Sequence, residues 1–165
     1  GAGNGMVGDE LNELGAETLV GIDIIPSAKE AAARDRPDVY DDYFVCDLTN
    51  VPEQLEEELR KKRLNCVASV AALGYGDIPP AAFIKSLDLI ETGGWVAINI
   101  KEDFLHESDT TGFCRLVRQL SREQIIKPYA YRRYRHRLSI AGTPLYYVAM
   151  VARKLRDVPG ELLSD

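Results

Sequence analysis

Apolar and polar residues follow one another along this chain in two kinds of block. Short apolar runs of the kind that forms buried parallel strands occupy residues 18–24, 43–47, 66–73 and 95–100. Between them lie segments patterned as amphipathic helices, at residues 26–34, 52–62, 81–90 and 111–120. Strands alternating with helices predict an α/β fold of the doubly wound kind, with right-handed crossovers and a mostly parallel sheet.

The end of the chain has a different pattern. Residues 127–138 and 145–154 are both patterned as strands, and the six residues between them include a Gly and a Pro. Strands joined by so short a link pair antiparallel, so we expect a C-terminal hairpin at a sheet edge. No repeat or low-complexity segment interrupts the pattern, and residues 1–165 are expected to form a single domain.

The chain opens with glycines at positions 1, 3, 5 and 8. Glycines let the backbone turn tightly and approach a ligand closely, and residues 9–14 are patterned as a helix that points its N-terminus at the same place. The spacing from Gly3 to Gly8 also matches the GxGxxG loop of nicotinamide and flavin domains. Such a loop normally follows a buried strand. We therefore expect the native protein to extend upstream, with the first strand missing from this chain.

Two acids end predicted strands. Asp23 falls 20 positions after Gly3, where a carboxylate can accept both ribose hydroxyls of an adenosine; the alternative is an Asp that caps the helix after Pro26. Asp47 can accept from an adenine amino group while the N–H of the neighbouring Leu48 meets a ring nitrogen. The alternative for Asp47 is an ordinary turn.

With its motifs in this order, the chain resembles the class I S-adenosylmethionine-dependent methyltransferases. The matching segments are GAGNG (1–5), GIDIIPSAKEAAAR (21–34), FVCDLTN (44–50), NCVASVAALGYGDIPP (65–80), LIETGGWVAINI (89–100) and the hairpin. Residues 70–105 are similar to the methyltransferase-like proteins related to the one from the Williams–Beuren deletion region. The family's acid two positions before Gly1 is not in this chain.

The resemblance implies a seven-stranded type of sheet and S-adenosylmethionine as the cofactor, with S-adenosylhomocysteine as the product. It implies cofactor contacts from Gly1, Ala2, Gly3, Gly5, Asp23, Ile24, Asp47, Leu48, Val70 and Ala71.

Methyl transfer is an in-line displacement in which the cofactor supplies the reactivity and the protein supplies position. Alignment alone can contribute about 7–11 kcal/mol, so a dedicated base is optional. The methyl group is expected over the ends of strands 66–73 and 95–100. Candidate catalytic residues there are Tyr75, Glu102, Asp103 and His106. The alternative for these residues is a charged, solvated loop.

Charge and cysteine usage bear on partners and compartment. The net charge of −6 argues against broad nucleic-acid binding, although residues 129–137 interleave Tyr with Arg. We expect that segment to protect the sheet edge or meet a small acidic partner. The methyl acceptor is then a small molecule or a protein, and nucleic acid is not expected.

Three cysteines without CxxC spacing, with Cys46 and Cys66 in apolar runs that should bury them, suit a reducing cytoplasm. The two histidines, His106 and His136, are too isolated for a metal site, and no apolar run approaches the roughly 20 residues of a membrane span. Two other classes stay open: an NAD(P)-dependent oxidoreductase of the Rossmann type, and a non-catalytic methyltransferase-like binding module.

Overall fold

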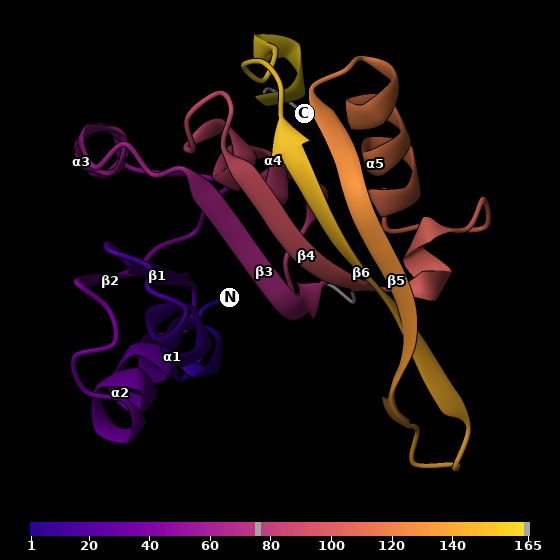
Figure 1. Ribbon diagram of the computed structural model, residues 1–165, viewed down its shortest axis with the longest axis horizontal. Coiled ribbons are helices and arrows are strands. Elements are labelled where there is room, and N and C mark those ends of the chain that lie inside the picture. Colours follow the sequence, from indigo (N-terminus) through magenta and orange to yellow (C-terminus); the bar gives the residue numbers. More distant parts are fainter. Residues whose placement is uncertain (75–76, 164–165) are drawn as a thin grey trace. The chain divides into compact units, whose positions relative to one another are not determined.

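The computed structural model describes residues 1–74 and 77–163. The chain divides into two compact units, Gly1–Leu55 and Glu56–Asp165, which are described separately (Figure 1). The first unit contains α1 (Met6–Glu13), β1 (Val20–Asp23), α2 (Pro26–Asp35) and β2 (Asp42–Val45). β1 and β2 pair in parallel, with Val20 opposite Asp42 and Asp23 opposite Val45.

Local chemistry explains the elements of the first unit. Pro26 stands in the first turn of α2, where its missing N–H costs no helical hydrogen bond, and the preceding Ile25 is extended. Tyr40 packs so closely on Gly8 of α1 that a Cβ built there would lie 2.6 Å from the tyrosine Cζ. A side chain at position 8 would force the tyrosine ring or the helix to shift, so Gly8 serves close packing rather than a turn.

The second unit is larger. It contains β3 (Cys66–Leu73), α4 (Pro80–Asp88), β4 (Trp95–Lys101), the 3₁₀ helix η1 (Glu102–Leu105), α5 (Phe113–Arg122), β5 (Ile126–Leu138), β6 (Pro144–Lys154) and the 3₁₀ helix η2 (Gly160–Leu163). Its four strands lie in the order β3-β4-β6-β5 (Figure 1). β3 and β4 are parallel, whereas β6 runs antiparallel to both of its neighbours.

One face of this sheet forms the core. Val96, Ile98 and Ile100 on β4 are at most 4% exposed and join a cluster with Phe83 and Leu87 of α4 and with residues of α5. The members from α5 are Phe113, Leu116 and Leu120. Each such side chain stabilises the fold by about 1.5–3 kcal/mol. The alternate residues of β4, which include Trp95 and Asn99, therefore lie on the opposite face of the sheet.

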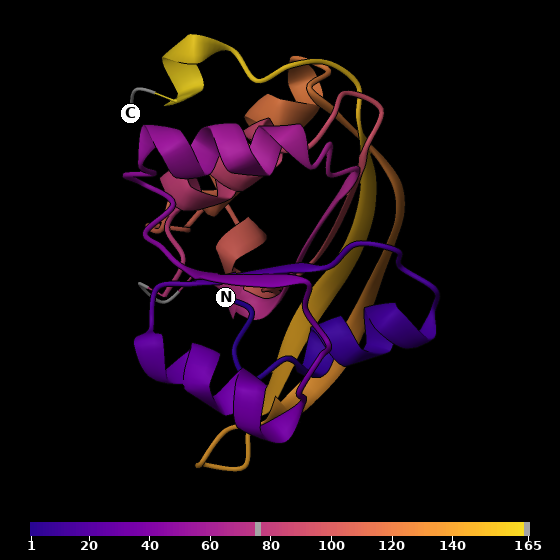
Figure 2. The same cartoon turned by 90° about the vertical axis from the view of Figure 1, so that its left-hand side faces the viewer.

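The helix α3 (Glu53–Lys61) runs across the boundary between the two units. Its last turns lie alongside α4 (Figure 2), and Arg60 bonds the Asp88 carboxylate at 2.5 Å. A second ion pair joins Glu56 to Lys85 at 2.6 Å. These two pairs fix α3 against α4 within the second unit.

A buried cation fastens the end of the last strand. Lys154 is 1% exposed, and its Nζ donates to the carbonyl oxygens of Ile90 at 2.7 Å and Asp88 at 3.3 Å. Both carbonyls lie at the C-terminal end of α4, where a positive charge is favourable. Burial lowers the pKa of Lys154 below its ordinary value.

The structure confirms the alternation of strands and helices and the terminal hairpin. It does not show the predicted single, mostly parallel sheet of seven-stranded type. The described strands form one sheet of two and one of four, with two parallel and two antiparallel pairs. The reason is that β1 pairs only with β2, and β3 only with β4, among the described residues. The two 3₁₀ helices were not predicted.

The expected burial of two cysteines was wrong. Cys66 is exposed because it opens the edge strand β3 beside Trp95, on the face away from the core, and Cys46 is half-buried. Cys114 is buried. None of the described helices is long and apolar enough to cross a membrane.

Candidate functional site

The glycine loop and the end of β1 are joined through Asp23. Its two carboxylate oxygens accept from the backbone N–H groups of Gly3, at 2.9 Å, and Ile25, at 3.0 Å. The side chain is 8% exposed, and each oxygen keeps a lone pair for a further donor. The bond to Ile25 fits the capping alternative. Because each oxygen keeps a lone pair, Asp23 could still accept ribose hydroxyls, and that role stays a prediction.

The loop itself is held in an open, left-handed conformation. Gly3 and Gly5 have φ angles of 55° and 88°, which side-chain-bearing residues rarely adopt. The N–H groups of Gly1 and Ala2 both donate to the carbonyl of Ile22, at 2.9 and 3.0 Å. A Cβ built on Gly3 would meet nothing within 4 Å, so the space beside that residue is free.

Tyr43 closes the loop from β2. Its hydroxyl donates to the carbonyl oxygen of Gly3 at 2.9 Å. Burial, reinforced by the nearby Asp23 carboxylate, raises the pKa of Tyr43 to about 12. The hydroxyl therefore stays protonated near neutral pH and keeps the loop carbonyl turned toward β2.

The second predicted acid has a local role in this structure. Asp47 is exposed, and its Oδ1 accepts from the backbone N–H of Thr49 at 2.8 Å and from its hydroxyl at 2.7 Å. These bonds lower the pKa of Asp47. The geometry is that of the turn alternative. Leu48 is half-buried, and Ile24, next to Asp23, leaves 57% of its surface exposed.

Val70 and Ala71 lie in an irregular part of β3, in the second unit. Ser69 pairs with Ile98 and Leu73 with Ile100, so β3 places more residues than β4 between these two points. Ala71 has a φ of 57°, and its N–H donates to the side-chain oxygen of Asn99 at 2.5 Å. Both Val70 and Ala71 are exposed. The Asn99 amide thus replaces a strand partner at this bulge.

The other end of the Asn99 amide leads to the hairpin. Asn99 is 7% exposed, and its Nδ2 donates to the Tyr134 hydroxyl at 2.8 Å. That hydroxyl lies 3.4 Å from Nδ1 of His136, whose ring centroid is 4.3 Å from that of Tyr147. Lys101, the last residue of β4, pairs with Tyr147. A polar and aromatic cluster therefore stands at the carboxyl end of β4.

The predicted catalytic residues after β4 do not form a cluster. Glu102 forms an ion pair with Arg133 at 2.7 Å, and that hydrogen bond lowers its pKa. Asp103 forms an ion pair with Lys101. His106 is exposed, and its ring has no hydrogen-bond partner among the residues that the structure describes. Tyr75 lies outside the described residues.

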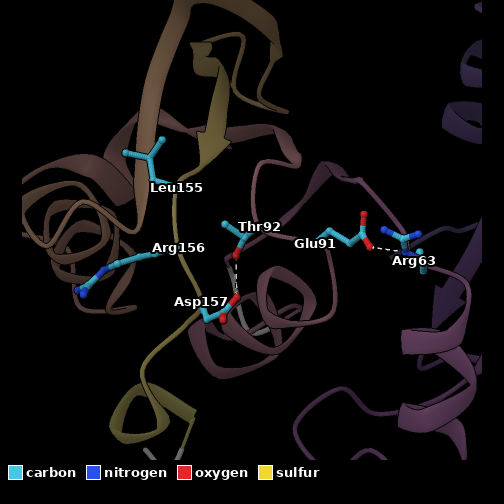
Figure 3. A pocket seen from close by; sticks show the side chains of 6 residues that line it. All are labelled: Arg63, Glu91, Thr92, Leu155, Arg156 and Asp157. Atoms are coloured by element: carbon cyan, nitrogen blue, oxygen red, sulfur yellow. Dashed lines mark hydrogen bonds and ion pairs between the residues drawn. The ribbon is translucent and has the colours of Figure 1, made fainter.

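A surface hollow of about 530 Å³ is found elsewhere, at the opposite end of β4 (Figure 3). It is lined by Arg63, Glu91, Thr92, Leu155, Arg156 and Asp157. Its polar groups satisfy one another, with Arg63 on Glu91 at 2.7 Å and Thr92 on Asp157 at 2.6 Å. None of the predicted site residues lines it. Within residues 1–74 and 77–163, no group of three or more His, Cys, Asp or Glu could hold a metal ion.

No protein-family model matches the sequence, and no curated protein matches it. Solved structures do match. A methyltransferase from Methanosarcina mazei, described as S-adenosylmethionine-dependent, superposes with a TM-score of 0.65 at 15% identity, over 95% of this chain and 91% of that one. An rRNA methylase from Streptococcus thermophilus gives a TM-score of 0.58 at 20% identity, over 94% of this chain and 84% of that one.

The fold is that of the S-adenosylmethionine-dependent methyltransferases. The antiparallel hairpin of β5 and β6 agrees with this fold, because such a hairpin is not expected for the alternative, an oxidoreductase of the Rossmann type. A methyltransferase fold does not decide the reaction. The [4+2]-cyclase SpnF also matches, with a TM-score of 0.63 at 13% identity, over 94% of this chain and 73% of that one.

Sequence reasoning missed Asn99 and its partners on the hairpin of this methyltransferase fold. Asn99 is the one polar residue in the apolar run WVAINI, and a buried amide within a strand signals a required hydrogen bond. Tyr134 and His136 stand in the basic segment, where the surrounding arginines concealed them. Their approach to Asn99 depends on strand order, which the sequence pattern does not provide.

Proposed function

We propose that this chain transfers the methyl group of S-adenosylmethionine to an acceptor by in-line displacement. The observation that carries the proposal is the Asp23 carboxylate tied to Gly3 within a methyltransferase fold. S-adenosylmethionine would supply the reactive methyl group. The chain's own residues bind the cofactor and orient it toward the acceptor.

The residues of the first unit suit that cofactor. Free lone pairs on Asp23 can accept the ribose hydroxyls, and the open space at Gly3 lets the backbone approach the ligand. The exposed apolar side chains of Ile24 and Ile25 offer a surface for a flat base. In this proposal Gly1, Ala2 and Gly5 complete the loop, and Asp47 and Leu48 bind the adenine edge.

In the second unit, we assign Val70 and Ala71 to the surroundings of the methyl group. Among the predicted proton acceptors, His106 is favoured over Glu102 and Asp103, because both carboxylates are held by cations. The acceptor was predicted from sequence to be a small molecule or a protein in the cytoplasm. Fold alone does not select it, since the similar structures include an rRNA methylase.

Calorimetric titration with S-adenosylhomocysteine tests the proposal, with NAD as the control ligand. We expect a dissociation constant near micromolar, about −8 kcal/mol, and no heat with NAD. Binding of NAD alone would replace the proposal with the oxidoreductase alternative. Binding of neither ligand by the folded protein would support a non-catalytic module.

A further inference from the structure

Charge is divided unevenly between the C-terminal hairpin and the rest of the chain. Residues 126–154 contain seven Lys and Arg and no Asp or Glu, which leaves 13 basic and 26 acidic residues elsewhere. The net charge of −6 is therefore an average over two oppositely charged parts. An argument from that average does not apply to the hairpin.

The arginines of β5 are free for a partner. Arg132, Arg135 and Arg137 are exposed, and no carboxylate pairs with them among the described residues. Arg133 is the exception, because Glu102 holds it. The register with β6 puts Arg132 and Arg137 on one face of the hairpin and Arg135 on the other, so the three unpaired guanidinium groups flank the outer edge of β5. Arginine binds phosphate with two parallel hydrogen bonds, so this edge can bind anions from both sides.

Exposed aromatic rings accompany these charges. Tyr131 is 78% exposed and Tyr129 is 60% exposed. Tyr129 meets Trp95 edge to face at 5.5 Å, and the Arg153 guanidinium lies 4.5 Å from the centre of the Trp95 ring. Exposed aromatic rings beside cations suit the stacking of unpaired bases, and each stacked base contributes about 1–3 kcal/mol.

The hairpin also extends past the sheet (Figures 1 and 2). β4 ends at Lys101 opposite Tyr147, so residues 144–146 of β6 pair with β5 alone. The 13 residues of β5 span about 43 Å at 3.3 Å per residue. That length accommodates several nucleotides in an extended strand.

Protection of the sheet edge explains these features less well. Charges of either sign discourage edge-to-edge pairing, so protection does not require the complete absence of acids. β5 also carries two irregularities, near Pro128 and between Arg135 and Arg137, and each already interrupts a pairing edge. The excess of unpaired arginine beside exposed tyrosine therefore indicates a ligand.

We propose that β5 and the projecting end of the hairpin bind single-stranded RNA, with arginines on the phosphates and tyrosines against the bases. RNA is favoured over an acidic protein because the exposed rings recognise unstacked bases. The proposed RNA-binding residues of the hairpin are far along the chain from the glycine loop, and this proposal does not depend on S-adenosylmethionine binding.

Fluorescence anisotropy with 5′-labelled 12-mers of U and of A, at 50 to 200 mM KCl, tests this. The variant R132Q/R135Q/R137Q removes three charges without breaking a described ion pair. It should weaken binding at least tenfold. It should also make the negative slope of log K, the association constant, against log salt shallower by about 2, since each phosphate contact to a single strand contributes about 0.7 to the slope. The control R34Q/R63Q/R122Q changes net charge equally on exposed arginines elsewhere, each of which pairs with a surface carboxylate, and should keep the wild-type affinity within twofold.

Tyr131→Ala separates stacking from charge. It should weaken binding about tenfold while leaving the salt slope unchanged, and Tyr131→Phe should restore the affinity. Circular dichroism and the S-adenosylhomocysteine titration, measured on the same variants, report folding and the cofactor site independently. No binding at 50 mM KCl, equal losses in the control triple, or tighter binding of polyglutamate or anionic vesicles than of RNA would each overturn the proposal.

Discussion

The amide of Asn99 on β4 reaches the hydroxyl of Tyr134 on β5, at 2.8 Å, although β6 lies between the two strands. The bond crosses one face of the sheet, and the oxygen of the same amide holds the N–H of Ala71 at the β3 bulge. One side chain thus couples strands at both edges of the four-stranded sheet. Such networks are stabilising only when every member is satisfied.

A double-mutant cycle measures that coupling. Asn99→Ala should cost about 2 kcal/mol in the free energy of unfolding, and Tyr134→Phe about 1 kcal/mol, because each leaves a polar partner without its bond. The double variant should be less destabilised than the sum by about 1 kcal/mol. Urea unfolding supplies all four values, and strictly additive losses would show that the bond contributes nothing.

Asp23→Asn tests the junction of loop and strand. The substitution puts an amide N–H₂ against one of two backbone N–H donors, so we expect a loss of about 1–3 kcal/mol in stability. Affinity for S-adenosylhomocysteine should fall tenfold or more, as measured by calorimetry. Asp47→Asn is the matched control for stability, since its exposed carboxylate serves only Thr49, and its melting temperature should equal that of the wild type.

The contact between Gly8 and Tyr40 predicts a position-specific intolerance. Gly8→Ala places a methyl group 2.6 Å from Cζ of the tyrosine and should destabilise the protein by about 1–3 kcal/mol through overpacking. Gly160→Ala meets nothing within 4 Å and serves as the control. Thermal unfolding of the two variants compares them, and equal melting temperatures would mean that the helix moves away from Tyr40 at no cost.

Lys154 predicts a pH dependence of stability. Its pKa in the folded protein is below the ordinary 10.5, so the unfolded chain binds more protons between the two values. Stability relative to Lys154→Met should therefore rise as the pH increases through that window toward 10.5. Urea unfolding from pH 8 to 10.5 gives the difference, and Lys127→Met, which removes an exposed ammonium group, should run parallel to the wild type.

Glu102 is predicted to restrain Arg133 and not to stabilise the fold. Glu102→Gln breaks an exposed ion pair, and such pairs contribute little, so the urea midpoint should not change. The released guanidinium adds one phosphate contact, which at 0.1 M salt should strengthen RNA binding by at most about fivefold. Anisotropy measures the change; weaker binding would mean that the carboxylate orients Arg133 for the RNA.

Local patterns in the sequence were sufficient to find the α-helices and strands, but not the two 3₁₀ helices. Pro26 marked the start of α2, and the apolar run at residues 95–100 corresponds to β4 with only Lys101 added. Which strands pair with one another within the sheets was not predictable in the same way. β1 and β3 are both apolar and strand-like, and nothing in their composition says which neighbours they have.

The sequence predicted some contacts of the candidate site and missed others, and the difference has a physical reason. Gly3 and Asp23 lie at a fixed distance across one loop, helix and strand, so their contact follows from sequence spacing. Glu102 and Asp103 were chosen by position after β4, and their cations come from the hairpin and from β4 itself. The Asn99 bond to Tyr134 spans 35 residues and depends on side-chain direction, which no local pattern encodes.

The place of β6 in the sheet has a consequence for biosynthesis. β6 is the last of the six strands in the described part of the chain to leave the ribosome, yet it occupies an inner position between β4 and β5. Until it emerges, the nascent second unit presents two strands with exposed pairing edges and no common partner. The completed sheet therefore forms late in translation, and the buried ammonium of Lys154 is added at its final step.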